Sequence, residues 1–218
     1  IQDEGSQILA LLVGARPGMT VIDLCAGTGG KTLALAANMA EQGRLAGYLY
    51  ACDVSSIRLN RMKARAKRAG AFGIKSQTIS GADDKWVIAN QNRADRVLID
   101  VPCTGTGVWR RDLNLKWRYQ PGDLDNFLKK QQDIMNAAST LVKCGGRLIY
   151  ATCSILLEEN EQQVDWFLSE HQNFIALSMD EVWTESLKNT ALKTGVGLRL
   201  SPASTATDGF FCAVFKRQ

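Results

Sequence analysis

Histidine is almost absent from this chain of 218 residues, which contains only His171. Enzymes that use a Ser-His-Asp or Cys-His set need an imidazole beside the nucleophile, so such a mechanism would depend on that one residue. Zinc sites draw most of their ligands from histidine and from cysteine in Cys-x-x-Cys pairs. Because the six cysteines of this chain form no such pair, we expect no metal site.

The sequence also lacks the features of membrane and secreted proteins. No apolar run is long enough to cross a bilayer, and no charged segment followed by an apolar one opens the chain. Neither sign of charge is in large excess, since 26 Lys and Arg accompany 22 Asp and Glu, a net charge of +4. This balance permits a polyanionic partner without establishing one. Free cysteines in a chain with an ordinary core indicate a reducing compartment, so we expect a cytoplasmic protein.

Strand-like apolar segments alternate with helical segments along the sequence. A chain of this length with 45% hydrophobic residues can bury one core, so we expect residues 1–218 to form one domain. The alternation is typical of an α/β fold with a doubly wound, mostly parallel sheet. We expect residues 180–197 to be irregular. The predicted strands are residues 20–25, 45–52, 74–79, 96–100, 147–153, 198–200 and 209–216, and the predicted helices are 30–39, 55–69, 124–142 and 158–170.

Two of the predicted strands lead directly into a cysteine. Residues 97–103 read VLIDVPC, and residues 147–153 read RLIYATC. Parallel strands end at one carboxyl edge of the sheet, where open α/β sheets bind their ligands, so both thiols would lie there. One such thiol could be a packing residue, but Cys103 and Cys153 together, beside a cofactor loop, indicate nucleophilic chemistry. We expect the other four cysteines, Cys25, Cys52, Cys144 and Cys212, to be small core residues.

A glycine-rich loop, IDLCAGTGGKT at residues 22–32, joins the first predicted strand to the first predicted helix. Glycines there let backbone N–H groups approach a ligand, although they could also serve packing alone. The spacing matches neither GxGxxG nor the P-loop. Asp53 ends the second strand, where a carboxylate can bind both ribose hydroxyls or simply favour the start of a helix. These features favour a nucleoside cofactor, and either Asp83 or Asp84 could meet its adenine amino group.

With these motifs together, the chain resembles the S-adenosylmethionine-dependent RNA cytosine-5 methyltransferases of the Sun/Fmu type. A Pro-Cys motif followed by a Thr-Cys motif, in this order, is highly specific. The resemblance implies a Rossmann-like, seven-stranded sheet of the class I methyltransferase type, with S-adenosylmethionine as cofactor, and we expect a monomer. The matching segments run from residues 2–7 to the end of the chain and include DLCAGTGGK at 23–31, DVPCTGTG at 100–107, ATCS at 151–154, EENE at 158–161 and DGFF at 208–211.

The resemblance also implies roles for individual residues. Cys153 of the Thr-Cys motif would be the nucleophile, Cys103 of the Pro-Cys motif would serve product release, and Asp100 would face the base. Family members carry an additional RNA-binding module outside the catalytic domain, and we expect this module to be absent from a chain that starts at Ile1. The implied cofactor-binding residues are Cys25, Ala26, Gly27, Thr28, Gly29, Gly30, Lys31, Asp53, Arg58, Asp83 and Asp100.

The implied reaction is methylation of carbon 5 of a cytosine in RNA, with ribosomal RNA as the expected substrate and transfer RNA as the alternative. Carbon 5 is too weak a nucleophile by itself, so a thiolate must first add to carbon 6. A DNA cytosine-5 methyltransferase would use the Pro-Cys thiol for this attack. A non-catalytic RNA-binding protein on the same fold would not need both cysteines. Aromatic and basic residues at 109–111 and 116–119 are the candidate RNA contacts, unless they form a packed loop.

Overall fold

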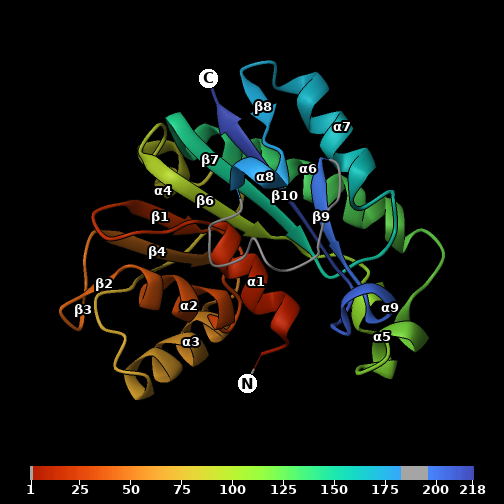
Figure 1. The fold of residues 1–218 in the computed structure, drawn as a ribbon, viewed down its shortest axis with the longest axis horizontal. Helices are drawn as coiled ribbons and strands as arrows, with labels where there is room; N and C mark the ends of the chain where they lie inside the picture. The colour runs from red at the N-terminus through yellow and green to blue at the C-terminus, as the bar shows by residue number, and fades with distance from the viewer. Residues whose placement is uncertain (1, 183–195) are drawn as a thin grey trace.

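The computed structural model describes residues 2–182 and 196–218, and a mixed sheet of eight strands forms its centre (Figure 1). The strand order is β5-β4-β1-β6-β7-β10-β8, with β9 beside β10. The first five strands of that order are parallel, and β10 is antiparallel to β7, β8 and β9. The predicted mostly parallel sheet is confirmed, with β8 added to the seven expected strands. The strands are β1 (Thr20–Asp23), β4 (Tyr48–Asp53), β5 (Lys75–Thr78), β6 (Ala94–Asp100), β7 (Val142–Thr152), β8 (Phe174–Ala176), β9 (Gly197–Leu200) and β10 (Phe210–Arg217).

Helices cover both faces of this sheet (Figure 1). One face carries α1 (Glu4–Leu12), α2 (Gly30–Asn38) and α3 (Ser56–Arg68), and the other carries α4 (Lys85–Ala89), α6 (Asp123–Leu141) and α7 (Glu161–Glu170). No helix in the described residues has the length and hydrophobicity needed to cross a membrane. The shorter elements are the hairpin β2 (Ala40–Glu41) and β3 (Arg44–Leu45), η1 (Thr106–Val108), α5 (Leu113–Arg118), α8 (Met179–Val182) and α9 (Pro202–Thr205).

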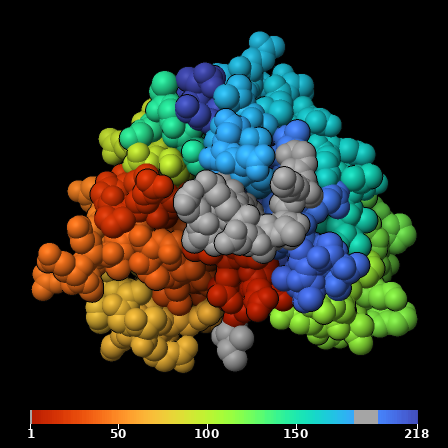
Figure 2. Space-filling model, in the orientation of Figure 1, coloured from red at the N-terminus to blue at the C-terminus, as the bar shows by residue number. Residues whose placement is uncertain are grey.

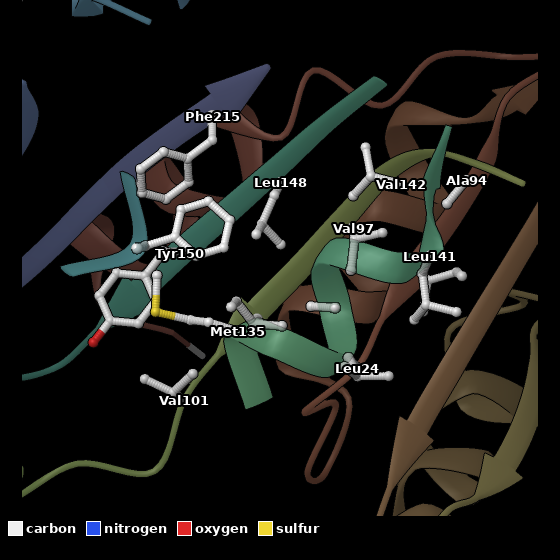
Figure 3. Packing of buried hydrophobic residues seen from close by; sticks show 14 of the residues in the cluster. Leu24, Ala94, Val97, Val101, Met135, Leu141, Val142, Leu148, Tyr150 and Phe215 are labelled. Atoms are coloured by element: carbon white, nitrogen blue, oxygen red, sulfur yellow. The ribbon is translucent and has the colours of Figure 1, made fainter. Parts of the chain in front are cut away.

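The central strands are apolar on both sides, and β6 shows why. Val97 and Ile99 pack in the cluster beneath α6, whereas Leu98 belongs to the cluster beneath α1 and α2. Figure 3 shows the side chain of Met135 of α6 extending toward the Tyr150 ring of β7, and both residues belong to the same cluster as Val97. Each fully buried apolar side chain of this size contributes about 1.5–3 kcal/mol relative to an exposed one. A continuous apolar run therefore marks a strand buried on both faces, as expected for a parallel sheet with helices on each side.

The strand order reverses between β1 and β6, which are neighbours although β4 and β5 separate them in sequence. Open α/β sheets bind ligands outside the carboxyl ends of the strands at such a point. The glycine-rich loop follows β1, Asp53 ends β4, Asp100 ends β6, and Cys153 follows β7. The topology alone therefore brings these segments to one edge of the sheet.

The N-terminal segment lies beside the turn that precedes β10, as the red and blue surfaces of Figure 2 show. Asp3 caps α1 by accepting the Gly5 N–H at 2.8 Å, and its other oxygen accepts the Asp208 N–H at 3.3 Å. Arg110 and Arg111, from the loop after Cys103, both form ion pairs with the buried Asp208 carboxylate. These two arginines, candidate RNA contacts in the sequence, therefore fasten that loop to the body of the protein.

Candidate functional site

A cavity of about 740 Å³ opens at the carboxyl edge of the sheet. Its wall is formed by the ends of β1, β4 and β6, the loop after β5, part of α6 and the start of the loop after β7. Most of the predicted site residues lie on this wall, because strand ends supply it. The predicted site residues that line the cavity are Cys25, Ala26, Gly27, Thr28, Gly30, Lys31, Asp53, Arg58, Asp100, Cys103 and Cys153.

Two predicted cofactor residues, Gly29 and Asp83, do not line this cavity. Gly29 has a φ of 82° at the start of α2, and a Cβ there would lie 2.1 Å from Met62 Cγ, so its place in the loop is structural. Asp83 is exposed, while Asp84 caps α4 by accepting two N–H groups of its own segment at 2.8 and 2.9 Å. The geometry therefore supports neither acid as an adenine ligand, and the residues just before them form the wall instead.

Asp53 forms several contacts in the half of the cavity that lies beside the glycine-rich loop. Its Oδ2 accepts the Gly27 N–H at 2.8 Å, and its Oδ1 accepts the Ser55 N–H at 2.8 Å and lies 3.1 Å from Arg58 Nη2. The side chain is buried yet forms part of the cavity wall. A carboxylate has roughly four acceptor positions, so these contacts fix its orientation and leave capacity for a ligand hydroxyl.

Asp23, at the end of β1, is a buried acid on the cavity wall that the sequence did not single out. Its Oδ2 accepts the Thr32 hydroxyl at 2.6 Å, whereas its Oδ1 has no hydrogen-bond partner in the described part of the chain. Burial raises the pKa of Asp23 to about 7, against the lowering effect of the Thr32 hydrogen bond. Buried polar atoms are normally paired, so an unpaired oxygen on a cavity wall indicates a place for a polar or cationic ligand group.

The raised pKa of Asp23 predicts that stability falls as pH rises. Its protonated form favours folding, so this contribution is complete below the unfolded pKa of 3.8 and is lost as pH rises through about 7. At about 1.4 kcal/mol per pKa unit, we expect a loss of roughly 2–3 kcal/mol between pH 5 and pH 8. Urea unfolding without cofactor should show this extra loss in the wild type but not in Asp23→Asn. The same pH dependence in both proteins would contradict the assignment.

Cys103 and Cys153 meet in the other half of the cavity, with their Sγ atoms 3.4 Å apart. The parallel pairing continues past the strands, since the Val101 N–H donates to the Ala151 carbonyl at 3.0 Å. The Gly107 N–H then donates to the Cys153 carbonyl at 3.0 Å, which joins the two cysteine loops. The prediction that both thiols emerge at the carboxyl edge is therefore confirmed, and the structure adds that they are in contact.

The two thiols differ in acidity because their neighbours differ. The hydrogen bond with Cys103 lowers the pKa of Cys153, and the nearby Lys31 ammonium lowers it further. Burial and the Asp100 charge act in the opposite direction. The pKa of Cys103 is raised well above its ordinary value by its hydrogen bond to Cys153, by burial, and by the charges of Cys153 and Glu159. Cys153 is therefore the more acidic of the two thiols, and its ionised form would accept a hydrogen bond from Cys103.

Lys31 and Asp100 form an ion pair between the two halves of the cavity. Lys31 Nζ lies 2.6 Å from Asp100 Oδ2, and the two side chains are 9% and 33% exposed. Burial alone would lower the pKa of Lys31, but the charge and hydrogen bond of Asp100 raise it, so the ammonium is retained. The pair uses Oδ2 of Asp100, which leaves Oδ1 able to accept a hydrogen bond from a ligand.

The remaining cysteines occupy three kinds of position. Cys52 and Cys212 are buried, as predicted, and Cys25 lines the cavity. Cys144 is exposed on β7, so the prediction of a core residue was wrong there. Within the described ranges, no group of three or more His, Cys, Asp and Glu side chains could hold a metal ion.

The aromatic and basic residues after Cys103 divide into an anchored and an exposed set. Trp109 is anchored, since its Nε1 donates to the Thr104 carbonyl at 3.3 Å. Trp117 on α5 is 77% exposed, and Leu115 of the same helix lines the cavity. The exposed set, residues 116–118, therefore lies on a helix that borders the cavity, where bases can stack on an aromatic ring.

Comparison with known proteins shows the family of this chain. The model of the 16S rRNA methyltransferase RsmB/F family matches residues 10–216. The chain belongs to this family. It is 34% identical over its whole length to the probable ribosomal RNA small subunit methyltransferase B of Synechocystis sp., and 35% identical over 98% of its length to the ribosomal RNA small subunit methyltransferase B of Sodalis glossinidius. It covers 47% and 45% of these relatives, so it spans about half their length.

A solved structure supports both the class I methyltransferase fold and the cofactor of this RsmB/F family chain. The crystal structure of NSun6 from Pyrococcus horikoshii with SFG, an analogue of S-adenosylmethionine, matches with a TM-score of 0.80. The match covers 99% of this chain and 52% of that one, at 25% identity. Together with the family, it confirms the predicted cofactor as S-adenosylmethionine.

Independently of the comparisons, the residues of the cavity wall are suited to bind S-adenosylmethionine. Asp53 retains acceptor capacity for ribose hydroxyls, and a Cβ on Gly27 would meet no atom within 4 Å, so the loop opens onto free space. The unpaired Asp23 Oδ1 and the free Asp100 Oδ1 can accept hydrogen bonds from polar groups of the ligand. A volume of about 740 Å³ is also in the range of ordinary small-molecule sites.

Asp53→Ala should weaken the binding of S-adenosylmethionine by about 1.5–3 kcal/mol, the effect of losing hydrogen bonds to a charged group. Titration calorimetry on the folded variant measures this loss directly. Asp83→Ala is the matched control, because it removes an exposed carboxylate from the same edge of the sheet and should leave the affinity unchanged. Unchanged affinity in Asp53→Ala would remove this residue from the site.

Proposed function

We propose that this chain is the catalytic part of an RNA cytosine-5 methyltransferase that acts through a covalent bond between Cys153 and the base. The observation that carries the proposal is the 3.4 Å contact between two thiols of unlike acidity on the wall of the cofactor cavity. When bound, S-adenosylmethionine supplies an electrophilic methyl group. Small-subunit ribosomal RNA is the substrate we propose, because the relatives are named as methyltransferases of that RNA.

The first task of the protein is to activate the base. The Cys153 thiolate adds to carbon 6 of cytosine, which places electron density on carbon 5. Lys31 favours the thiolate, since its positive charge lowers the pKa of Cys153. Oδ2 of Asp100 accepts from Lys31, so its free Oδ1 would accept a hydrogen bond from the exocyclic amine of the base.

The second task is to release the product. After methylation, carbon 5 carries both a methyl group and a proton, and the proton must leave before the bond between carbon 6 and sulfur can break. Once Cys153 is bonded to the base, it no longer carries the charge that raises the pKa of Cys103. Cys103 can then lose its proton to solvent and take the carbon 5 proton, while the electron pair restores the ring double bond and expels the Cys153 thiolate.

Bisulfite sequencing of RNA tests this function, because 5-methylcytosine resists conversion. A strain lacking the full-length gene should lose protection at a cytosine of the small-subunit ribosomal RNA, and the full-length gene should restore it. Loss of protection in transfer RNA instead would support the alternative substrate. Unchanged protection in every RNA would contradict the proposed reaction.

A further inference from the structure

Two consecutive buried residues, Glu159 and Asn160, lie behind the two cysteine loops. Both are fully buried and immediately precede α7, and neither lines the cavity. The Tyr150 hydroxyl donates to the Glu159 carbonyl at 2.6 Å, which fixes this pair to β7. This contact holds the backbone at Glu159 beside β7, in addition to the side-chain contacts with the cysteine loops.

Glu159 holds the residue after Cys103 directly and reaches the residue before it through Gln131. Its Oε1 accepts the Thr104 N–H at 2.9 Å, and its Oε2 accepts the Thr104 hydroxyl at 2.6 Å. Gln131 of α6 donates to the same Oε1 and to the Pro102 carbonyl, each at 3.0 Å. Thr104 is thus bonded to one buried carboxylate, and Pro102 is linked to the same carboxylate through Gln131.

Asn160 does the same for the loop of Cys153. Its Oδ1 accepts the Thr152 hydroxyl at 2.7 Å, and its Nδ2 donates to the Ser154 carbonyl at 3.0 Å. The residues before and after this cysteine are therefore tied to a neutral amide. The amide matches one donor and one acceptor, an arrangement that a carboxylate could not satisfy.

We propose that Glu159 and Asn160 are positioning residues that hold the two thiols in contact and make them chemically unlike. Glu159 places a negative charge behind the Cys103 loop, which keeps that thiol protonated. Asn160 brings no charge to the Cys153 loop, so that thiol ionises under the influence of Lys31. The separate roles of Cys153 and Cys103 in the proposed reaction rest on this difference in acidity. The difference in acidity can be measured in the absence of RNA.

Charge and hydrogen bonding can be separated at Glu159. Glu159→Gln keeps an acceptor for the Thr104 N–H and for Gln131 and removes the charge. Its amide can donate to the Thr104 hydroxyl in place of the bond that is lost. Glu158→Gln is the matched control, because it makes the same change one residue earlier. A role confined to structure would alter stability but not the acidity of Cys103.

The test is the pH dependence of alkylation by iodoacetamide at Cys103 and Cys153, measured by peptide mass spectrometry on the folded protein. In the wild type, Cys153 should react with the lower pH midpoint. Glu159→Gln should lower the Cys103 midpoint by about one pH unit, as expected for losing a buried like charge, and Glu158→Gln should change neither midpoint. Equal or reversed midpoints in the wild type would overturn the inference, even if a variant fails to fold. An unchanged Cys103 midpoint in folded Glu159→Gln would overturn it as well.

This test is independent of the proposed function. Midpoints that behave as expected in a protein that methylates no cytosine would refute the proposed function and leave the positioning roles intact. RNA methylation with a Cys103 midpoint that does not respond to Glu159→Gln would refute the positioning roles alone.

Discussion

Cys153→Ala should abolish methyl transfer, with a loss of at least about 10⁴-fold, and should form no covalent complex with RNA, because the nucleophile is gone. Cys103→Ala should still attack and methylate but stall before release, so a protein–RNA complex should accumulate and survive denaturation. The asymmetry follows from the order of events, since the nucleophile acts before methyl transfer and the eliminating group acts after it. Denaturing gels with S-adenosylmethionine and small-subunit ribosomal RNA separate the two outcomes, in the full-length protein that carries this chain.

Cys144→Ala is the control for this experiment, because Cys144 is an exposed thiol outside the cavity. It should behave as the wild type. A mechanism of the DNA methyltransferase type assigns the attack to Cys103. A stable complex with Cys153→Ala and none with Cys103→Ala would therefore reverse the assignment.

Lys31→Met should slow methyl transfer by about 10²–10³-fold at neutral pH, the size of effect seen when a preorganised charge is removed from an active site. Without the ammonium, the pKa of Cys153 loses a lowering influence and Asp100 loses its partner. The pH at which the rate reaches half its maximum should therefore rise. Single-turnover rates across a range of pH, with saturating cofactor, measure both effects.

Lys143→Met is the matched control, because Lys143 also forms a lysine–aspartate ion pair, with Asp95 at 2.5 Å, but does not line the cavity. It should leave both the rate and its pH midpoint unchanged. A Lys31→Met enzyme that is slower but keeps the wild-type pH midpoint would show that the lysine does not set the ionisation of Cys153.

The sequence predicted the elements whose pattern is long and apolar. The strands β1, β4, β6, β7 and β10 are buried by helices or neighbouring strands, so their residues read as apolar runs. α5, β8 and the β2–β3 hairpin were not predicted, because each is too short to show a period or is defined by backbone pairing alone. α1 was missed as well, although it has nine residues like the predicted α2. Of the expected irregular segment 180–197, the positions 183–195 lie outside the described residues, while α8 and β9 border them.

The site was predictable where strand ends supply it, and unpredictable where packing does. Parallel strands carry their last residues to one edge, which is why Asp53, Asp100 and the two cysteines could be placed together from sequence. The unpaired oxygen of Asp23 became visible only with the burial of β1. The role of Asp84 could have been predicted from the sequence, because an aspartate two residues before Trp86 can cap the start of a helix.

The most direct measurement of the central claim is the identity of the residue that bonds to RNA. Small-subunit ribosomal RNA containing 5-fluorocytidine retains the covalent complex, because fluorine at carbon 5 cannot leave as a proton does. After incubation of the full-length protein with this RNA and S-adenosylmethionine, protease and nuclease digestion followed by mass spectrometry locates the modified peptide. We expect the nucleotide, with its added methyl group, on Cys153. A nucleotide on Cys103, or no covalent complex under conditions in which unmodified RNA is methylated, would contradict the account.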